Sequence, residues 1–250
     1  MFFILPCRHD LAWTVESIPL FVFASSIKEL LFNQNIDEAI LHYYIYKRKA
    51  GAAKDCESKY IPFSILQPSA FTHLEKERLP GIEEEINRAI EDMGSNIKKL
   101  IIPINTSKAI VNGEIQEIGM HWNLLVYVVN TCEWQHFNSV RSNTYKSKYL
   151  EDAKNMADYC QPHINKWCKK NNRRQNINSV VNFTSMEVPE QGSDPDCLLY
   201  LCYWFKRSVK PSKPMIADPE WLKELMHNRR VTVAYKLLTA KYPEKSWGNF

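Results

Sequence analysis

Three strand-like runs in the middle of the chain constrain its fold more than any other feature. Leu, Ile, Val and aromatic side chains dominate residues 99–104 and 121–129, and the run 134–138 carries Trp134 and Phe137. Such side chains favour β-strands, so the runs predict three strands that are at least partly buried. The pair Asn112-Gly113 lies between the first two runs and is typical of a tight hairpin turn.

Segments with helical periodicity lie before and after these strands along the chain. Apolar residues recur near the helical period in residues 26–47, and Asn35 is a candidate N-cap where this region restarts. Residues 48–60 are charged and contain glycine, so we expect a loop there. The further predicted helices are residues 82–93, 146–170, 197–205 and a C-terminal region from Asp218 to Lys241.

Proline positions predict where three of the elements begin, end or are interrupted. Pro162 lies within residues 146–170 and should break or kink that helix. Asp218 followed by Pro219 is typical of a helix start, with Asp218 as the N-cap. Residues 178–188, which end at Pro189, are expected to form a further strand. Helices first, strands in the middle and helices last together predict an α+β fold.

The composition suits one folded domain over residues 1–250. The chain is 45% hydrophobic and has only 7 glycines, so it can bury one sizeable core and contains no long low-complexity tract. The net charge of +4 is too small to indicate nucleic acid and is compatible with an acidic protein partner. No uninterrupted apolar stretch reaches about 18 residues, so no membrane span is expected.

The cysteines and the opening residues favour a reducing compartment. Seven cysteines, an odd number without regular spacing, argue against a disulfide framework. Residues 1–6 are apolar but short and lack a basic flank, which indicates an edge strand or the remnant of a longer N-terminal region rather than a secretory signal. Without secretion, the sequons at Asn105 and Asn182 are chance matches.

Four residues from different parts of the chain match the needs of a thiol protease. Such an enzyme needs a thiolate, an imidazole beside it, a group that orients the imidazole, and donors for an oxyanion. Cys197 opens an apolar helix, whose positive N-terminus lowers the pKa of a thiol. His121 begins one predicted strand and Asn138 ends the next, so paired strands can bring them side by side. Gln191 precedes Cys197 by six positions and carries an amide donor.

We therefore predict a role for each of the four. Cys197 is the nucleophile, His121 is its base, and Asn138 accepts from the ring of His121 and fixes its tautomer. Gln191 and the backbone N–H of Cys197 are the oxyanion donors. Taken alone, Cys197 could equally be a buried structural thiol, and it is the combination of the four residues that favours catalysis.

The runs that carry these residues resemble the motifs of a known protease family. They read His121-Trp122-x-Leu124-x-Val126, then Phe137-Asn138-Ser139, then Val188 to Cys197. Their order and gaps are similar to the His-Trp, Tyr-Asp-Ser and Pro-Gln-Gln-Asn-x-x-Asp-Cys-Gly pattern of the ubiquitin-like-protein-specific, or SUMO/sentrin, cysteine proteases. Weaker resemblance at residues 37–40 and 229–234 extends the match over roughly residues 25–240.

This resemblance implies an adenain-like α+β fold, with a central mixed sheet flanked by helices and the active site between them. It implies hydrolysis after the C-terminal Gly-Gly of SUMO or a related modifier, in a conjugate or a precursor, without a cofactor. Trp122 would help to roof the narrow tunnel that receives this tail. We expect a monomer in the nucleus or cytoplasm whose partner is a ubiquitin-like modifier, with SUMO foremost.

Three positions depart from the family pattern. Asn138 stands where Asp is usual, and an amide stabilises imidazolium less than a carboxylate does. Leu198 replaces the glycine after the cysteine. Residues 34–37 read Gln-Asn-Ile-Asp instead of Trp-Leu-Asn-Asp, so the clamping Trp is missing, although Phe32 lies close by. These departures leave open a weakened or inactive member that binds a modifier. An acyltransferase that uses the same thiol is a third option, although the sequence has no coenzyme-binding signature.

Two other clusters have simpler interpretations. Cys160, His163 and Cys168 have no fourth ligand and no Cys-x-x-Cys spacing, so we expect no metal site. The basic residues between Lys166 and Arg174 and the pair Arg229-Arg230 could contact nucleic acid, but the first cluster lacks an aromatic platform or a recognition motif. A solvated face is the favoured interpretation, and a docking surface for an acidic modifier is the second.

Overall fold

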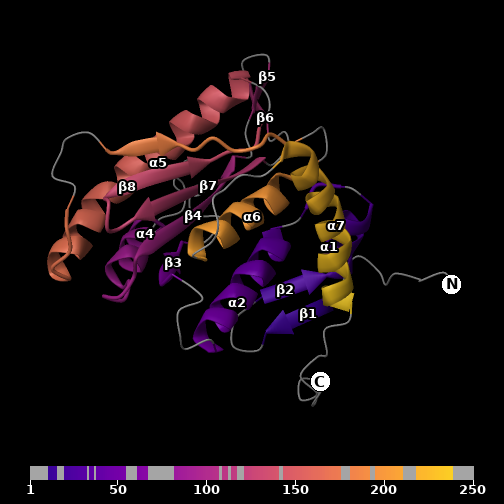
Figure 1. Cartoon of the computed structure of the whole chain (residues 1–250), viewed down its shortest axis with the longest axis horizontal. Helices are drawn as coiled ribbons and strands as arrows, with labels where there is room; N and C mark the ends of the chain where they lie inside the picture. Colours follow the sequence, from indigo (N-terminus) through magenta and orange to yellow (C-terminus); the bar gives the residue numbers. More distant parts are fainter. Residues whose placement is uncertain are drawn as a thin grey trace.

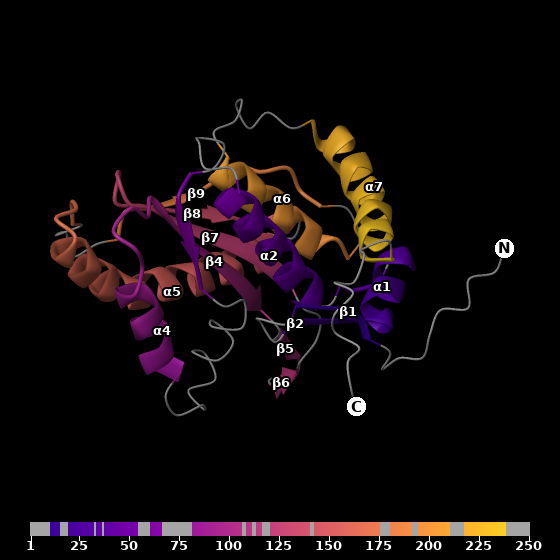
Figure 2. The ribbon, with the colours of Figure 1, turned by 90° about the horizontal axis from the view of Figure 1, so that it is seen from below.

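A mixed sheet between two layers of helices forms the centre of the protein (Figures 1 and 2). This arrangement confirms the predicted α+β fold with a central sheet flanked by helices. The computed structural model describes residues 11–15, 20–32, 34–36, 38–54, 61–66, 82–106, 109–111, 114–116, 121–140, 143–175, 181–191, 195–210 and 218–238.

The five-stranded sheet has the order β3-β4-β7-β8-β9. Its three central strands are antiparallel to one another, whereas the two outer strands run parallel to their neighbours. The three strand-like runs of the sequence form the three central strands, as predicted. The strands are β3 (Phe63–Ile65), β4 (Lys99–Thr106), β7 (His121–Val128), β8 (Glu133–Phe137) and β9 (Phe183–Ser185).

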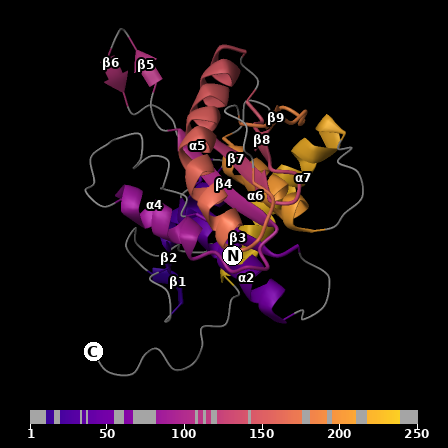
Figure 3. The same ribbon diagram turned by 90° about the vertical axis from the view of Figure 1, so that its left-hand side faces the viewer.

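Two short hairpins lie outside this sheet. One pairs β1 (Leu11–Val15) with β2 (Leu20–Phe23). The other pairs β5 (Ala109–Val111) with β6 (Glu114–Gln116) and projects beyond the sheet (Figure 3). Val111 pairs with Glu114 in the second hairpin, and the turn predicted at residues 112–113 lies outside the described residues.

Helices cover both faces of the sheet in the described part of the chain. On one face, α6 packs on β7 and β4, and α2 packs on α6. The helix α7 packs against both α6 and α1. On the other face, α5 lies along the strands and α4 packs against α5 (Figures 2 and 3). The helices are α1 (Ala24–Leu31), α2 (Glu38–Lys54), α4 (Ile82–Glu91), α5 (Asn143–Lys170), α6 (Cys197–Val209) and α7 (Pro219–Leu238).

The side chains of β7 point alternately into the two hydrophobic cores, and this alternation decides on which face His121 lies. Leu124 and Val126 pack in the core beneath α6, whereas Leu125 and Tyr127 pack in the core beneath α5. Successive side chains of a strand point to opposite faces, so His121, the first residue of β7, lies on the α5 side. Because β7 begins at His121, this residue stands at the edge of the sheet, between the helices that cover its two faces.

Two predictions about α2 were wrong. Residues 48–54, expected to be a loop, continue α2 as far as Lys54, because the lysines, arginine and alanines around Gly51 are good helix formers. Asn35 is not an N-cap, because α2 begins only at Glu38.

The remaining predictions to compare with the structure concern prolines and the ends of elements. Pro162 does not break α5, whose buried face packs along the sheet on both sides of the proline. The predicted strand 178–188 is limited to Phe183–Ser185 among the described residues, and Pro189 cannot donate to a ladder. The Asp218 cap is confirmed, since its Oδ1 accepts from the N–H of Glu220 at 2.8 Å. Residues 1–6 and 239–241 lie outside the described residues.

No helix in the described part of the chain has the length and apolar character needed to cross a membrane.

Candidate active site

Cys197 is the first residue of α6 and lies where that helix meets the start of β7. The apolar run that follows it is buried against the sheet, which fixes the helix N-terminus at this edge. The side chain of Cys197 is only 6% exposed. The predicted lowering of its pKa is wrong: burial raises the pKa of the thiol to about 11, and the backbone N–H groups of Trp122 and Leu198 oppose only part of this rise.

His121 and Asn138 meet at the same edge of the sheet. His121 Nε2 and Asn138 Oδ1 are 2.8 Å apart. The β7–β8 ladder ends at the pair Leu124–Phe137, and His121 and Asn138 lie three residues and one residue beyond this pair. The predicted juxtaposition is therefore present, and the catalytic role of the pair stays a prediction.

A second hydrogen bond fixes which nitrogen of His121 carries the proton. The backbone N–H of Val140 donates to Asn138 Oδ1 at 3.1 Å, so the amide oxygen of Asn138 faces both donors. Because this oxygen can only accept, His121 Nε2 must be protonated and donate to it. His121 Nδ1 then keeps a lone pair and is the ring nitrogen that can take a proton.

Ser139 holds Gln191 in place. The backbone N–H of Gln191 donates to the carbonyl oxygen of Ser139, and the hydroxyl of Ser139 donates to Gln191 Oε1, both at 2.8 Å. These two bonds tie the segment before α6 to the end of β8. Because the amide oxygen of Gln191 is engaged, its NH₂ group is the part left to donate, as an oxyanion donor requires.

The ring of His121 is clamped by an aromatic side chain of α5. Tyr149 stacks on it with ring centroids 4.5 Å apart and planes inclined by 16°. Burial beneath this stack lowers the pKa of His121 to about 4, although the hydrogen bond that His121 donates to Asn138 favours the protonated form. Tyr145, which is exposed, stacks in turn on Tyr149.

The thiol and the imidazole are therefore both neutral near pH 7 in this arrangement. A neutral pair can still perform nucleophilic chemistry if His121 removes the proton while the sulfur attacks. The N–H groups around Cys197 are suited to stabilise the negative charge that develops on the sulfur or on a carbonyl oxygen.

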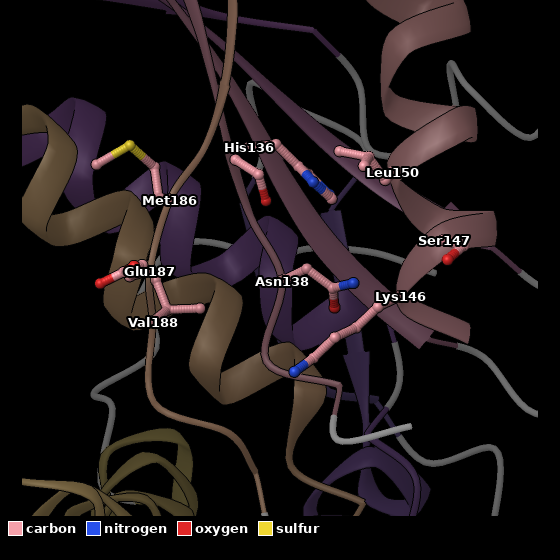
Figure 4. Close-up of a pocket in the computed structure, with 9 residues that line it drawn as sticks. His136, Asn138, Lys146, Ser147, Leu150, Met186, Glu187 and Val188 are labelled. Atoms are coloured by element: carbon pink, nitrogen blue, oxygen red, sulfur yellow. The ribbon is translucent and has the colours of Figure 1, made fainter. Parts of the chain in front are cut away.

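A pocket of about 360 Å³ opens beside Asn138 (Figure 4). Lys146, Ser147 and Leu150 of α5 line one side, and Met186, Glu187 and Val188 line the other. The ring of His136 also reaches it, and His136 Nε2 lies 3.1 Å from Asn123 Oδ1. The pocket therefore lies next to Asn138, between α5 and residues 185–188.

Trp122 occupies a different position from the other predicted site residues. It is 2% exposed and packs in the core beneath α6, on the opposite side of β7 from His121. Its backbone N–H, rather than its ring, approaches the thiol of Cys197. Its role in a substrate tunnel stays a prediction.

Cys160, Cys168 and several residues of the basic cluster lie in or just after α5. Cys160 and Cys168 are fully buried free thiols in the core beneath this helix. Among the residues that the structure describes, no group of three or more His, Cys, Asp or Glu side chains could hold a metal ion. Lys166 pairs with Glu91 at 2.5 Å, and Arg173 donates to the Ser95 carbonyl at 2.8 Å.

Ser139 and Tyr149 are the site residues that the sequence interpretation missed. Ser139 follows Asn138 directly, so a hydroxyl beside the predicted orienting residue was the available signal. No sequence signal points to Tyr149, because its stack on His121 is a tertiary contact between a helix and a distant strand.

Solved structures with a similar fold come from SUMO proteases. The C-terminal Ulp1 protease domain in complex with Smt3, the yeast ortholog of SUMO, matches with a TM-score of 0.58 and 16% identity, covering 94% of this chain and 90% of that one. The Ulp1-like SUMO protease catalytic domain of Chaetomium thermophilum matches with a TM-score of 0.57 and 13% identity, covering 93% and 84%. At these identities the likeness shows the fold alone.

Comparison at the level of sequence gives the family. A search of curated protein sequences found no match. A family model described as the Ulp1 protease family, C-terminal catalytic domain, matches residues 66–223, which is more than half of the chain. This span includes His121, Asn138, Gln191 and Cys197. The chain therefore belongs to the Ulp1 protease family.

Proposed function

We propose that the protein is a thiol peptidase that removes SUMO or a related ubiquitin-like modifier after its C-terminal Gly-Gly. The observation that carries the proposal is the hydrogen bond from His121 Nε2 to Asn138 Oδ1, which leaves His121 Nδ1 as a base. Membership of the Ulp1 protease family supports a cysteine peptidase. A similar solved structure that holds Smt3 supports SUMO as the modifier.

The proposed chemistry assigns one step to each of the predicted site residues. The sulfur of Cys197 attacks the carbonyl carbon of the last glycine while His121 Nδ1 takes the thiol proton. Gln191 and the N–H of Cys197 donate to the oxyanion, and His121 then returns the proton to the departing lysine amine. Water attacks the thioester with the same help from His121, which releases the modifier and restores the thiol.

Probes that trap a reactive thiol test this proposal directly. Vinyl-sulfone derivatives of SUMO, NEDD8 and ubiquitin are incubated with the protein, and we expect the SUMO probe to label Cys197. Cys197→Ala should abolish labelling and cleavage while the thermal unfolding midpoint stays close to that of the unmodified protein. Cys202→Ala, which removes another buried thiol of α6, is the matched control and should keep both. Absence of labelling with all three probes would count against the proposal.

A modifier-binding protein with little turnover is the second candidate. The favouring observation is that Cys197 is 6% exposed with a thiol pKa of about 11, so little thiolate exists near neutral pH. Leu198, where the family pattern has glycine, is also buried beside it. Calorimetry separates the two candidates: binding of a modifier without cleavage supports the second, and clear cleavage excludes it.

We further propose that residues 1–250 form a single catalytic domain that acts as a monomer in the nucleus or cytoplasm. Light scattering after size-exclusion chromatography tests the monomer, and imaging of a tagged chain tests the location.

A further inference from the structure

Arg230 of α7 is a buried arginine that joins three segments of the chain. It is 3% exposed, and its Nε lies 2.6 Å from Asp196 Oδ1. Its Nη2 donates to the Pro195 carbonyl at 2.9 Å. Its Nη1 donates to the carbonyls of Glu29, in α1, and Gln34, in the connection after α1, at 3.1 and 3.0 Å. The guanidinium thus ties the segment before α6 to the region around the end of α1.

Asp196 stands at the N-cap of α6 but does not cap it in the usual way. An aspartate at this position normally accepts from the N–H of the second or third helical residue. Within the described part of α6 the Asp196 side chain caps none of these groups, and its carboxylate turns to Arg230 instead. Its backbone carbonyl accepts from the N–H of Leu199 and Tyr200 at 2.8 and 3.0 Å.

This arrangement affects Cys197, the next residue. A carboxylate folded over the N-terminus of α6 would occupy N–H groups that otherwise reach the sulfur, and it would bring a negative charge to the thiol. The N–H groups of Leu198 and Cys197 do interact with this sulfur. The ion pair with Arg230 holds the carboxylate in another direction and balances its charge.

We propose that Arg230 is a positioning residue for the nucleophile. It balances the negative charge of the Asp196 carboxylate and holds this carboxylate away from the N-terminal N–H groups of α6. Arg230 acts through Asp196 and does not itself touch substrate. The role rests on the proposed function, because it takes Cys197 as the nucleophile.

The charged groups near Cys197 explain why this ion pair matters. Tyr149 of α5 interacts electrostatically with Cys197 and stacks on His121 of β7, and these two groups have pKa values of about 12 and about 4, so both are neutral near pH 7. Burial is the main cause that raises the pKa of Cys197, and the charge of Asp196 adds to it. Arg230 is the positive group that opposes the charge of Asp196.

The rate of Cys197 alkylation by iodoacetamide, followed by mass spectrometry at about pH 8, tests the proposal without a modifier. Below the thiol pKa this rate follows the thiolate fraction. Arg230→Met leaves Asp196 uncompensated and should slow alkylation about tenfold, which corresponds to a thiol pKa higher by about one unit. Asp196→Asn removes the negative charge next to the thiol and leaves the positive charge of Arg230 uncompensated, so it should speed alkylation severalfold.

Opposite effects of the two changes distinguish positioning by charge from a structural role, which would shift both rates in the same direction. Arg229→Met is the matched control, because Arg229 precedes Arg230 in α7 but lies over the ring of Tyr203. Its alkylation rate should equal that of the unmodified protein.

Three results would overturn the proposal: unchanged alkylation in folded Arg230→Met, unchanged or slower alkylation in Asp196→Asn, or equal slowing in Arg229→Met. If Arg230→Met does not fold, the direction of the change in Asp196→Asn decides alone. Failure of the modifier probes to label the protein leaves this alkylation test intact, so the two proposals can fail separately.

Discussion

The side-chain oxygen of Asn138 accepts two N–H groups at once, from His121 and Val140, and a carboxylate could accept both. Asn138→Asp should therefore keep the geometry and raise the pKa of His121 from about 4 by at least about one unit. The cleavage rate should be preserved or raised, and the acid limb of its pH profile should move to higher pH. A pH–rate profile with a modifier substrate checks this, and a large loss of activity would show that the site requires the amide.

Ser139 provides the second prediction at the scale of single residues. Ser139→Ala removes the hydroxyl that holds Gln191 Oε1, so the amide of Gln191 loses its fixed direction. We expect kcat to fall about tenfold while the alkylation rate of Cys197 stays unchanged, because Ser139 acts on the oxyanion donor and not on the thiol. Ser185→Ala, a serine of the neighbouring pocket, is the control. Unchanged kcat in Ser139→Ala would mean that Gln191 does not depend on this bond.

At the scale of elements, α5 continues through Pro162 although the ring removes one helical hydrogen bond and crowds the preceding turn. The neighbouring Gln161 accepts from the indole of Trp134 at 2.7 Å and anchors this part of the helix to β8. Pro162→Ala should raise the free energy of unfolding by about 1–3 kcal/mol, because proline costs about 3 kcal/mol relative to alanine inside a helix. Urea unfolding measures this, with Pro189→Ala, outside any helix, as control. A loss of stability would show that the packing of α5 needs a bend at Pro162.

The elements differ in how far their sequence predicts them. β4, β7 and β8 were predictable because their strand-like runs are dictated by burial on both faces of the sheet. The extension of α2 past Lys47 was not, because a glycine among charged residues suggests a loop, whereas the helix propensity of their neighbours prevails. The continuity of α5 depends on its packing against the sheet, which outweighs the local cost of Pro162.

The candidate site divides in the same way. Strand pairing brings His121 to Asn138, and an apolar helix places Cys197 at its N-terminus, so local patterns sufficed for these three residues. The ion pair of Arg230 with Asp196 joins residues 34 positions apart, and no periodic pattern links them. The burial of Cys197 likewise depends on how the helices close over the end of the sheet.

For the molecule as a whole, two buried His–Asn pairs link folding to pH. They are His121 with Asn138 and His136 with Asn123, and the two imidazoles are 7% and 1% exposed. Burial lowers their pKa values from 6.5 to about 4 and about 3. Between these values and 6.5 the unfolded chain binds more protons than the folded one. The free energy of unfolding should therefore fall as pH decreases below about 6.5.

Each buried imidazole should contribute a loss of about 2 kcal/mol between pH 7.5 and pH 5, which urea unfolding at the two pH values measures. His136→Gln should remove about half of the combined loss. His42→Gln, which changes a histidine of α2 whose side chain is 39% exposed, is the matched control and should leave the pH dependence unchanged. An equally steep dependence in His136→Gln would contradict a neutral, buried His136.

The same pH range also allows a prediction about catalysis. Because His121 stays unprotonated down to about pH 4 while the chain is folded, activity lost near pH 5 should accompany unfolding. Activity lost there with the fold intact would show that His121 accepts a proton far more readily than its burial allows.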